Sequence, residues 1–458
     1  MNREELIFSI RNLIARPDAT AVTAVLRSTP RADVADALDR YSTDELARFL
    51  AAASPRQRAD IFSALPANRQ DELLAALAPQ VVTELFTELP SDDRADIYNR
   101  LAPEARPRIL GALAQAERDD ILRLAAYPEG TVGSVTTSEY VWVDADASVS
   151  SALEHVRESA PDSETVYVVY VLGSERNLIG TVSLKDLVLA APELPVSEIM
   201  RAEPVLALAD WDREQAVELI RRYDLLALPV VDPDVRMIGI VSVDDAMDAA
   251  REDDATQLAR YGGTASLGGP DLDLRRSSLW KIFSTRVFWL SILTVFGILT
   301  STFVAAQEEI LTSVIVLAAF VAPIIDMGGN TGSQAATLVI RGMALGQVKL
   351  RLRDIGFVIR REIPVALALG ATIAVLEIVL AYFSKGVGVE VLIVVGLTMA
   401  AVTVLGGLIG SLLPFLARAM RTDPATLSAP MITSVMDLLG VFIYFGIAYA
   451  VLGASVGL

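Results

Sequence analysis

The stretch ATLSAPMITSVMDLLGVFIYFGIAYAVL at residues 425–452 decides the fold, because it is apolar, long enough to cross a bilayer and interrupted by one carboxylate, Asp437. It contains no Lys or Arg that could neutralise this charge. An ionisable group inside a membrane is costly, so its presence predicts a functional site. Asp326 and Glu377 lie in two further apolar segments whose hydrophobic stretches also lack basic residues. Acids without counter-charges predict a membrane protein that binds a cation.

Five apolar segments follow residue 280, and each reaches the length of about 20 residues that a spanning helix needs. The second is expected to be broken by Pro323 and nearby glycines. The predicted spans cover residues 287–306, 310–340, 363–383, 391–413 and 425–452.

Basic residues occupy alternate loops of this bundle, as the positive-inside rule requires of cytoplasmic loops. They are Lys281, Arg286, Arg341, Lys349, Arg351, Arg353, Arg360, Arg361, Arg418 and Arg421. We therefore expect a multi-pass protein of the cytoplasmic (inner) membrane, with its N-terminus inside and its C-terminus outside. The charged, amphipathic N-terminal residues do not have the pattern of a signal peptide.

The charges divide the chain into two parts. From Trp280 onward there are 11 basic and 9 acidic residues, which leaves 28 of the 39 basic and 48 of the 57 acidic residues in positions 1–279. So acidic a front argues against nucleic acid as a partner and favours cations. The chain has no cysteine and one histidine, His155, which excludes thiolate sites and argues against zinc. With no nucleophile–base constellation and no phosphate-binding glycine loop, we expect no enzyme.

Residues 1–130 contain a repeat in which Leu65, Leu77, Leu89, Leu101 and Leu113 recur at a step of 12. Prolines mark the junctions, at positions 66, 79, 90 and 103. Short helices ended by turns cannot bury their apolar faces alone, so we predict an all-α superhelical domain. The alternative is an ordinary helical bundle.

Residues 131–250 contain a duplication, because LIGTVSLKD at 178–186 and MIGIVSVDD at 237–245 share their Gly, Ser and Asp positions. Each copy predicts a strand followed by a helix that a serine begins. The pair resembles a tandem pair of CBS domains, the α/β Bateman module. Residues 251–280 are predicted to be a connector, first an acidic helix and then a glycine-rich linker, and residues 281–458 the helical membrane domain.

Asp437 is predicted to form an oxygen-lined cation site near the middle of its span. Pro430, seven residues earlier, is predicted to loosen the helix and free a backbone carbonyl. The alternative is a protonated Asp437 that seals a helix contact. Oxygen ligands without His or Cys favour hard ions such as Mg²⁺ or Ca²⁺, although these residues alone leave monovalent and divalent cations open.

The order of the four parts resembles the MgtE family of magnesium channels and transporters, as do GGNTGSQAAT at 328–337 and DPATLSAPMITSVMDLLGVFIYF at 423–445. The resemblance covers essentially the whole chain. It implies Mg²⁺ uptake by a homodimer in the lipid bilayer, with Asp437 binding hydrated Mg²⁺ in the pore and Asn330 lining it.

The same resemblance implies that acidic residues of the front sense cytoplasmic Mg²⁺ and close the pore when it is high. Independently, like charges on apposed surfaces repel unless cations neutralise them. For any one of these residues, a solvated surface acid is the alternative. The residues that match the family's sensor set are Asp60, Asp92, Asp96, Asp212, Glu214, Asp224, Asp245, Asp248 and Asp253.

Three other functions stay open from the sequence. CBS pairs often bind adenine nucleotides, and Ser183, Asp186, Ser242 and Asp245 stand where such modules contact ribose and phosphate, so ATP is a candidate regulatory ligand. A transporter of broader divalent range, including Co²⁺ and Mn²⁺, is the second. The third is a membrane-anchored Mg²⁺ or nucleotide sensor that conducts nothing, although an anchor would have no need of intramembrane acids.

Overall fold

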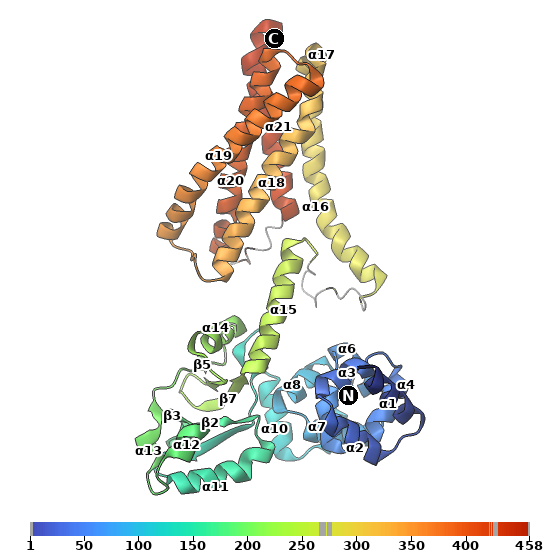
Figure 1. Ribbon diagram of the computed structural model, residues 1–458, viewed down its shortest axis with the longest axis vertical. Helices are drawn as coiled ribbons and strands as arrows, with labels where there is room; N and C mark the ends of the chain where they lie inside the picture. Colours follow the sequence, from blue (N-terminus) through green and yellow to red (C-terminus); the bar gives the residue numbers. More distant parts are fainter. Residues whose placement is uncertain are drawn as a thin grey trace. The chain divides into compact units, whose positions relative to one another are not determined.

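The structure is a computed structural model that describes residues 3–264, 272, 277–420, 422, 424 and 429–456. The chain divides into two compact units, Met1–Arg251 and Glu252–Leu458 (Figure 1). The predicted linker residues Gly268, Gly269 and Pro270, and residues 425–428 of the predicted fifth span, lie outside the described residues.

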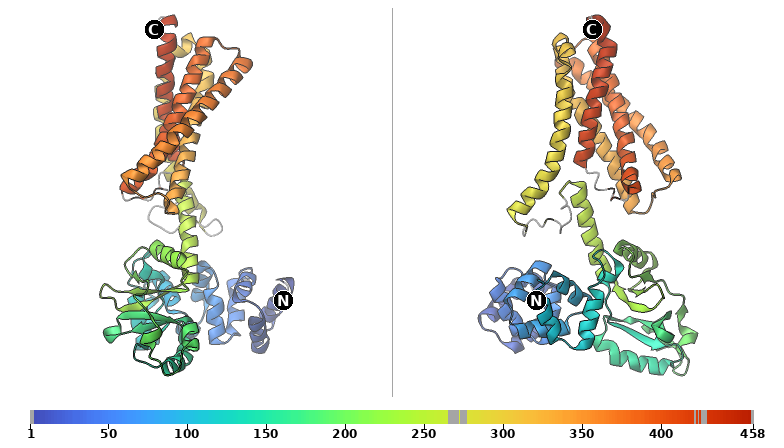
Figure 2. Two further views of the ribbon diagram at one scale, coloured as in Figure 1. Left: turned by 60° about the vertical axis from the view of Figure 1, so that its left-hand side comes forward. Right: turned by 180° about the vertical axis from the view of Figure 1, so that it is seen from behind.

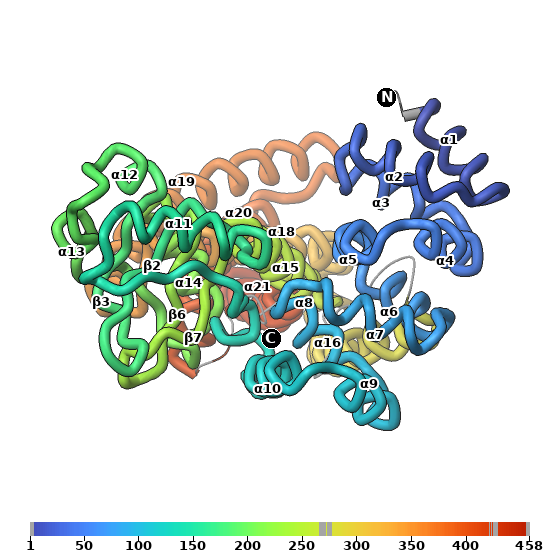
Figure 3. The backbone as a smooth tube through the Cα atoms, turned by 90° about the horizontal axis from the view of Figure 1, so that it is seen from below, coloured from blue at the N-terminus to red at the C-terminus, as the bar shows by residue number. Residues whose placement is uncertain are grey.

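The predicted N domain, residues 1–130, contains helices and no strand within its described residues 3–130, as predicted (Figure 3). Helices two places apart in the chain pack on each other: α3 contacts α1 and α5, α5 contacts α7, and α4 contacts α6. The helices are α1 (Arg3–Ala15), α2 (Ala19–Ser28), α3 (Arg31–Leu38), α4 (Thr43–Ala51), α5 (Pro55–Ser63), α6 (Ala67–Ala76), α7 (Pro79–Glu88), α8 (Ser91–Arg100), α9 (Arg106–Ala112) and α10 (Gln115–Leu124).

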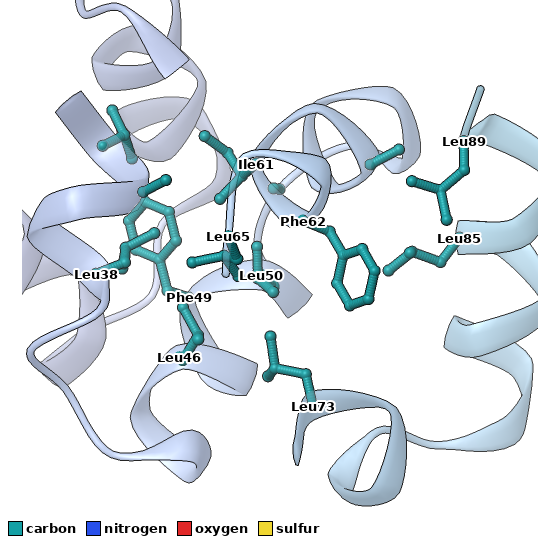
Figure 4. Packing of buried hydrophobic residues seen from close by; sticks show 14 of the residues in the cluster. Leu38, Leu46, Phe49, Leu50, Ile61, Phe62, Leu65, Leu73, Leu85 and Leu89 are labelled. Atoms are coloured by element: carbon teal, nitrogen blue, oxygen red, sulfur yellow. The ribbon is translucent and has the colours of Figure 1, made fainter. Parts of the chain in front are cut away.

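The repeated leucines of this domain stand at helix ends and pack in or against its core: four follow a helix directly, and Leu65 follows the C-cap residue of α5. Leu77 and Leu89 are the C-caps of α6 and α7, while Pro66 and Pro90 are the N-caps of α6 and α8. Proline suits these positions because it sets an extended entry and needs no N–H partner there. Leu65 and Leu89 are buried in a core with Phe49 and Phe62 (Figure 4). The repeat therefore encodes helix ends and core packing at once.

The CBS pair, residues 131–250, contains two sheets that repeat one topology. In each, two parallel strands are joined through a helix and the second strand continues into an antiparallel hairpin. The first copy contains β1 (Tyr140–Asp144), α11 (Val149–Ser159), β2 (Thr165–Leu172), β3 (Leu178–Ser183), α12 (Leu184–Leu189), α13 (Val196–Ile199) and β4 (Arg201–Ala202). The second contains β5 (Ala207–Leu208), α14 (Arg213–Tyr223), β6 (Ala227–Val231), β7 (Met237–Ser242) and α15 (Val243–Tyr261). Short 3₁₀ turns are η1 (Val132–Val135), η2 (Ala160–Asp162) and η3 (Ser174–Arg176).

The duplicated motif occupies equivalent places in the two sheets. Ser183 pairs with Val168, and Ser242 pairs with Ala227, so both serines end the antiparallel strand and begin the next helix. A shared core that includes Tyr170 and Ile240 joins the sheets. The predicted tandem α/β module is therefore confirmed.

The C-terminal unit contains five helices long and apolar enough to span a membrane, among the residues that the structure describes. They are α16 (Leu279–Ala305), α18 (Ala318–Ala344), α19 (Leu352–Lys385), α20 (Val389–Ala419) and α21 (Ala429–Val456), with α17 (Glu308–Ser313) and η4 (Ile315–Leu317) before α18. Helices α18, α20 and α21 contact one another, while α16 packs on α21 and α19 on α20. Figures 1 and 2 show α16 and α19 on opposite sides of this core.

The predicted break of the second span at Pro323 is wrong. Helix α18 runs without interruption through Pro323 and the glycines, and the chain instead turns at Val314, between α17 and η4. Neighbouring helices can satisfy the backbone groups that a proline leaves free, so a membrane helix tolerates one. The carbonyl that Pro430 is predicted to free belongs to residue 426, outside the described residues, and Pro430 itself stands in the first described turn of α21.

Glycines bring α18 and α20 into backbone contact. A Cβ on Gly406 would lie 2.5 Å from the carbonyl oxygen of Gly328, and one on Gly410 would collide with that of Gly332. These small residues recur every four positions on each helix, which is the spacing of a membrane packing face. This contact fixes which face of α18 is buried and, by exclusion, which face is open.

Candidate functional site

Helix α18 carries a polar stripe on its open face. Asp326, Asn330, Gln334 and Thr337 follow each other at steps of four, four and three residues and are all exposed in the single chain. The other face, with Gly328, is buried against the bundle. In a bilayer, such a polar row does not face lipid; it faces water or protein. The stripe therefore marks one wall of a hydrated path or of a contact with another chain.

Helix α21 runs antiparallel to α18 and places Asp437 opposite the stripe. The register is fixed by three contacts: the Ser333 hydroxyl lies 3.4 Å from the carbonyl oxygen of Ala429, Gly329 lies against Thr433, and Gly440 lies against Ile325. Residue numbers fall along α18 as they rise along α21 through these three contacts, so the two helices are antiparallel.

The resulting register puts Asp437 opposite Asp326, about two turns into α21. The Asp437 carboxylate is half-buried, and its Oδ1 atom is fully buried without a hydrogen-bond partner among the described residues. A buried carboxylate oxygen without a donor is costly, and a cation would satisfy it.

Glu377 lies elsewhere in the bundle. Its helix α19 packs chiefly on α20, where Gly370 approaches Ala400 and Ile378 approaches Gly396. Glu377 therefore does not belong to the α18–α21 pair within the chain.

The N domain and the CBS pair meet through a polar contact at the start of α8. The buried Ser91 hydroxyl accepts a 2.7 Å hydrogen bond from the backbone N–H of Ser138 and lies 3.0 Å from the Thr137 hydroxyl. Arg94, also buried, donates to Glu139 at 2.5 Å. Burial raises the pKa of Glu139 to about 7 although Arg94 opposes the shift.

Five acids gather at this contact and are called here the interface acids: Asp92, Asp93, Glu164, Asp244 and Asp245. Burial raises the pKa of Asp92 well above its ordinary value, and the charges of Asp245, Asp93 and Glu164 raise it further. Burial also raises the pKa of Asp245 to about 7, against a hydrogen bond from Ser242. The Oδ1 atom of Asp92 is buried with no hydrogen-bond partner among the described residues.

The interface acids repel one another, so the contact is strained whenever they are ionised. In the described parts of the chain, no three acidic or histidine side chains stand close enough together to hold a metal ion directly. A cation there would have to act through its water shell, or after a small closing movement.

The sequence-based sensor set is thus only partly brought together. Asp92 and Asp245 belong to the interface acids, whereas Asp60, Asp96, Asp212, Glu214, Asp224 and Asp248 are exposed and Asp253 is half-buried. Three of these have local roles. Asp212 caps α14 by accepting a 3.0 Å hydrogen bond from the N–H of Glu214, and Asp224 ends the same helix in a left-handed conformation. Asp248 forms an ion pair with Arg251, with 3.6 Å between the charged atoms.

Sequence reasoning missed Asp93, Asp244 and Glu164. The first two stand next to predicted residues, and a pair of adjacent acids at a helix start is a signal that could have been used. Glu164 precedes β2 and comes from a different part of the chain, so only the tertiary fold reveals it.

The two predicted nucleotide-contact pairs form the same local structure. Ser183 accepts from the N–H of Asp186 at 3.0 Å and donates to its carboxylate at 2.7 Å. Ser242 makes the equivalent two hydrogen bonds with Asp245. Each pair therefore caps a helix, and each carboxylate keeps oxygen atoms at a helix N-terminus.

Helix α15 ends on the stripe-bearing helix. The Tyr261 hydroxyl donates a 3.1 Å hydrogen bond to the carbonyl oxygen of Ser333 and lies 2.5 Å from the Thr337 hydroxyl. Ser333 and Thr337 both lie in the half of α18 that follows Asn330. The connector is thus helical up to Tyr261 and contacts the candidate ion path.

Comparison with known proteins identifies these parts. The model of the MgtE divalent cation transporter family matches residues 321–447, that of the MgtE intracellular N domain matches residues 29–130, and that of the CBS domain matches residues 132–193 and 196–252. The magnesium transporter MgtE of Thermus thermophilus is 36% identical over 336 residues, which is 73% of each chain. This chain belongs to the MgtE family. It is accordingly a transporter-family protein and not an enzyme.

Further relatives agree with this assignment. The magnesium transporter MgtE of Bacillus subtilis is 30% identical over 327 residues, 71% of each chain. A crystal structure of the soluble part of a magnesium transporter matches 55% of this MgtE-family chain and 99% of its own, with 25% identity and a TM-score of 0.53. The cytosolic domain of the Mg²⁺ channel MgtE in complex with ATP matches 53% of this chain and 99% of its own, with 33% identity and a TM-score of 0.50.

Proposed function

We propose that the chain is a Mg²⁺ channel or transporter for magnesium uptake across the cytoplasmic membrane, active as a homodimer and closed by high cytoplasmic Mg²⁺. The observation that carries the proposal is the unsatisfied Asp437 carboxylate opposite the polar stripe of α18, inside a bundle of apolar helices. Asn330 belongs to that stripe and would contact the water shell of the ion. Mg²⁺ loses its waters reluctantly, so a sparse oxygen site suits it.

Two observations support a homodimer. The stripe is exposed in the single chain, and a second copy would enclose it. In the CBS pair, Val188 and Met247 occupy equivalent positions of the two copies and are 63% and 62% exposed. Apolar side chains repeated at equivalent exposed positions favour a symmetric contact.

The regulatory half of the proposal rests on the interface acids. Above the raised pKa values of Asp92 and Asp245, these groups carry negative charge and push the N domain from the CBS pair. A divalent cation removes that repulsion and favours the closed contact, because a ligand stabilises the state that it binds better. Tyr261 gives α15 a hydrogen-bonded contact on α18 through which closure would act.

Transport is tested by Mg²⁺ flux into proteoliposomes that contain the full-length protein or Asp437→Ala. We expect the variant to lose uptake; flux equal to that of the parent would refute Asp437 as the ion site. A sensor that conducts nothing would give no flux with either protein. Replacing Mg²⁺ by Co²⁺ or Mn²⁺ in the same vesicles distinguishes a broader divalent transporter.

Feedback is tested by limited proteolysis of the full-length protein, with and without Mg²⁺ at millimolar concentrations. We expect Mg²⁺ to protect cleavage sites within residues 1–261. Equal cleavage in both conditions would exclude a Mg²⁺ sensor in this region.

We also propose ATP as a second regulatory ligand. Two equivalent helix-capping pairs support it, Ser183 with Asp186 and Ser242 with Asp245. The related cytosolic domain of the Mg²⁺ channel MgtE was crystallised in complex with ATP. Calorimetry with ATP on the parent and on Asp186→Ala tests it. Binding to the parent that the substitution abolishes would place ATP on the first CBS copy, and no heat with the parent would exclude this regulation.

A further inference from the structure

We propose that Asp326 of α18 is a second carboxylate of the ion path, opposite Asp437, and that this pair makes the path prefer divalent over monovalent cations. The inference deepens the proposed function and rests on it, because it concerns the same path.

The packing of α18 on α21 carries the first step. A Cβ on Gly329 would lie 2.7 Å from the Thr433 side chain, and one on Gly440 would lie 3.9 Å from the Cα of Ile325. The two carboxylates fall between these two contacts, each one turn or less from them.

The surroundings of Asp326 carry the second step. Its side chain is exposed in the single chain, and within the described residues it has neither a hydrogen-bond nor an ion-pair partner. It stands one turn from Asn330 in the polar stripe and shares its face of the helix. A carboxylate on lipid would be expensive, so this face must be hydrated or covered by a second chain.

The charge of the pair carries the third step. Coulomb energy is proportional to the product of the charges, so each carboxylate attracts Mg²⁺ twice as strongly as Na⁺ at the same distance. One carboxylate gives a modest preference for the divalent ion, and a second at the same depth roughly doubles the difference in free energy. The spans contain no basic residue beside the pair that would cancel this effect.

The test uses the full-length protein in proteoliposomes and measures uptake as a function of external Mg²⁺, with Na⁺ permeation measured in parallel. Asp326→Asn keeps the size and polarity of the side chain and removes its charge. We expect the Mg²⁺ concentration for half-maximal uptake to rise roughly tenfold and Na⁺ permeation to rise relative to that of Mg²⁺. Asp326→Glu should restore both values toward those of the parent.

Glu377→Gln is the matched control, because it removes one intramembrane charge from α19, which packs on α20. It should leave the affinity for Mg²⁺ and the ion preference unchanged. If Asp437→Asn abolishes uptake while Asp326→Asn behaves like the parent, the role of Asp326 is refuted and the proposed function stands. Loss of uptake by Asp326→Asn that Asp326→Glu does not restore also refutes a charge-based role. Undiminished uptake by Asp437→Asn refutes the proposed function itself.

Discussion

The acids of the membrane helices and the acids between the N domain and the CBS pair differ in what surrounds them. Asp326 and Asp437 stand on apolar helices without a basic neighbour in their spans. The interface acids lie in a contact that also contains the ion pair of buried Arg94 with half-buried Glu139. The positive charges of Arg31 and Arg56 also act on Glu164. A site without protein counter-charges needs an ion at all times, whereas a partly compensated site can hold or release one. The first arrangement suits a path and the second suits a switch.

The largest effect that we expect comes from the packing that holds the membrane acids in register. Gly410→Ala places a methyl group on the carbonyl oxygen of Gly332, which is backbone and cannot move aside alone. We expect a loss of about 3 kcal/mol in stability, because overpacking forces backbone shifts. Thermal unfolding of the purified full-length protein in detergent measures it.

Gly297→Ala on α16 is the control for that substitution, since a Cβ there meets no atom within 4 Å. It should leave the unfolding temperature unchanged or raise it slightly, because alanine favours the helix. Equal unfolding temperatures for both variants would show that the α18–α20 contact does not hold the bundle together.

The next effect concerns the contact between the N domain and the CBS pair, where Arg94 compensates the charge of Glu139. Arg94→Ala leaves Glu139 in a mostly buried position without its 2.5 Å partner. Breaking such a pair costs roughly 3 kcal/mol, so α8 should lose its contact with the CBS pair. Hydrogen exchange of the α8 amides should become much faster. Arg123→Ala, at a half-exposed pair with Asp120, should change little; unchanged exchange in Arg94→Ala would refute the anchoring role of Arg94.

The switch character of the interface acids predicts a pH dependence. The pKa of Asp245 is about 7 in the folded chain and ordinarily 3.8, so the unfolded or separated state loses its proton first. Stability of the contact therefore falls as the pH rises from about 4 to 7, and the penalty is complete above pH 7. Without Mg²⁺, we expect α8 amides, corrected for intrinsic rates, to exchange roughly tenfold faster at pH 8 than at pH 6.

Mg²⁺ should protect α8 more at pH 8 than at pH 6, since a cation binds ionised carboxylates. Asp92→Asn should reduce both the pH dependence and the effect of Mg²⁺, because it removes a buried charge from the set. The exposed Asp60→Asn is the control. An effect of Mg²⁺ that is equal at both pH values would argue against titrating acids as the sensor.

The smallest effect concerns the end of α15. Tyr261→Phe removes the hydroxyl that contacts the carbonyl of Ser333 and the hydroxyl of Thr337, worth about 1 kcal/mol. If closure acts through this contact, flux at high internal Mg²⁺ should increase up to about fivefold. Tyr223→Phe, an exposed tyrosine of α14, should behave like the parent. No change in Tyr261→Phe would remove this contact from the gating proposal.

The fold could be predicted from the sequence where one local pattern determines one element. The leucine step with its prolines predicts helices and their ends, and the duplicated Gly-Ser-Asp motif predicts two equivalent strand–helix corners. Pro323 misled the prediction because its missing hydrogen bond is tolerated within a packed bundle. That tolerance depends on neighbouring helices, which a linear pattern does not contain.

The candidate sites could be predicted only in part for the same reason. Asp437 was evident from its apolar surroundings in the sequence, whereas its position opposite Asp326 depends on how α21 packs on α18. Asp92 and Asp245 come from distant segments and meet only in the folded chain, together with Glu164. Family resemblance supplied the two aspartates, but it also supplied surface acids such as Asp60 that the fold leaves apart.

The two strand–helix junctions of the CBS pair, at Ser183 and Ser242, keep the same backbone structure but differ in what surrounds them. Ser183–Asp186 and Ser242–Asp245 share the same hydrogen bonds, yet Asp245 lies among the interface acids and Asp186 does not. The second copy therefore takes part in the contact with the N domain as well as capping its own helix. Duplication has thus produced two strand–helix corners with the same hydrogen bonds and different surroundings: that of Asp245 lies at the domain contact, and that of Asp186 lies outside it.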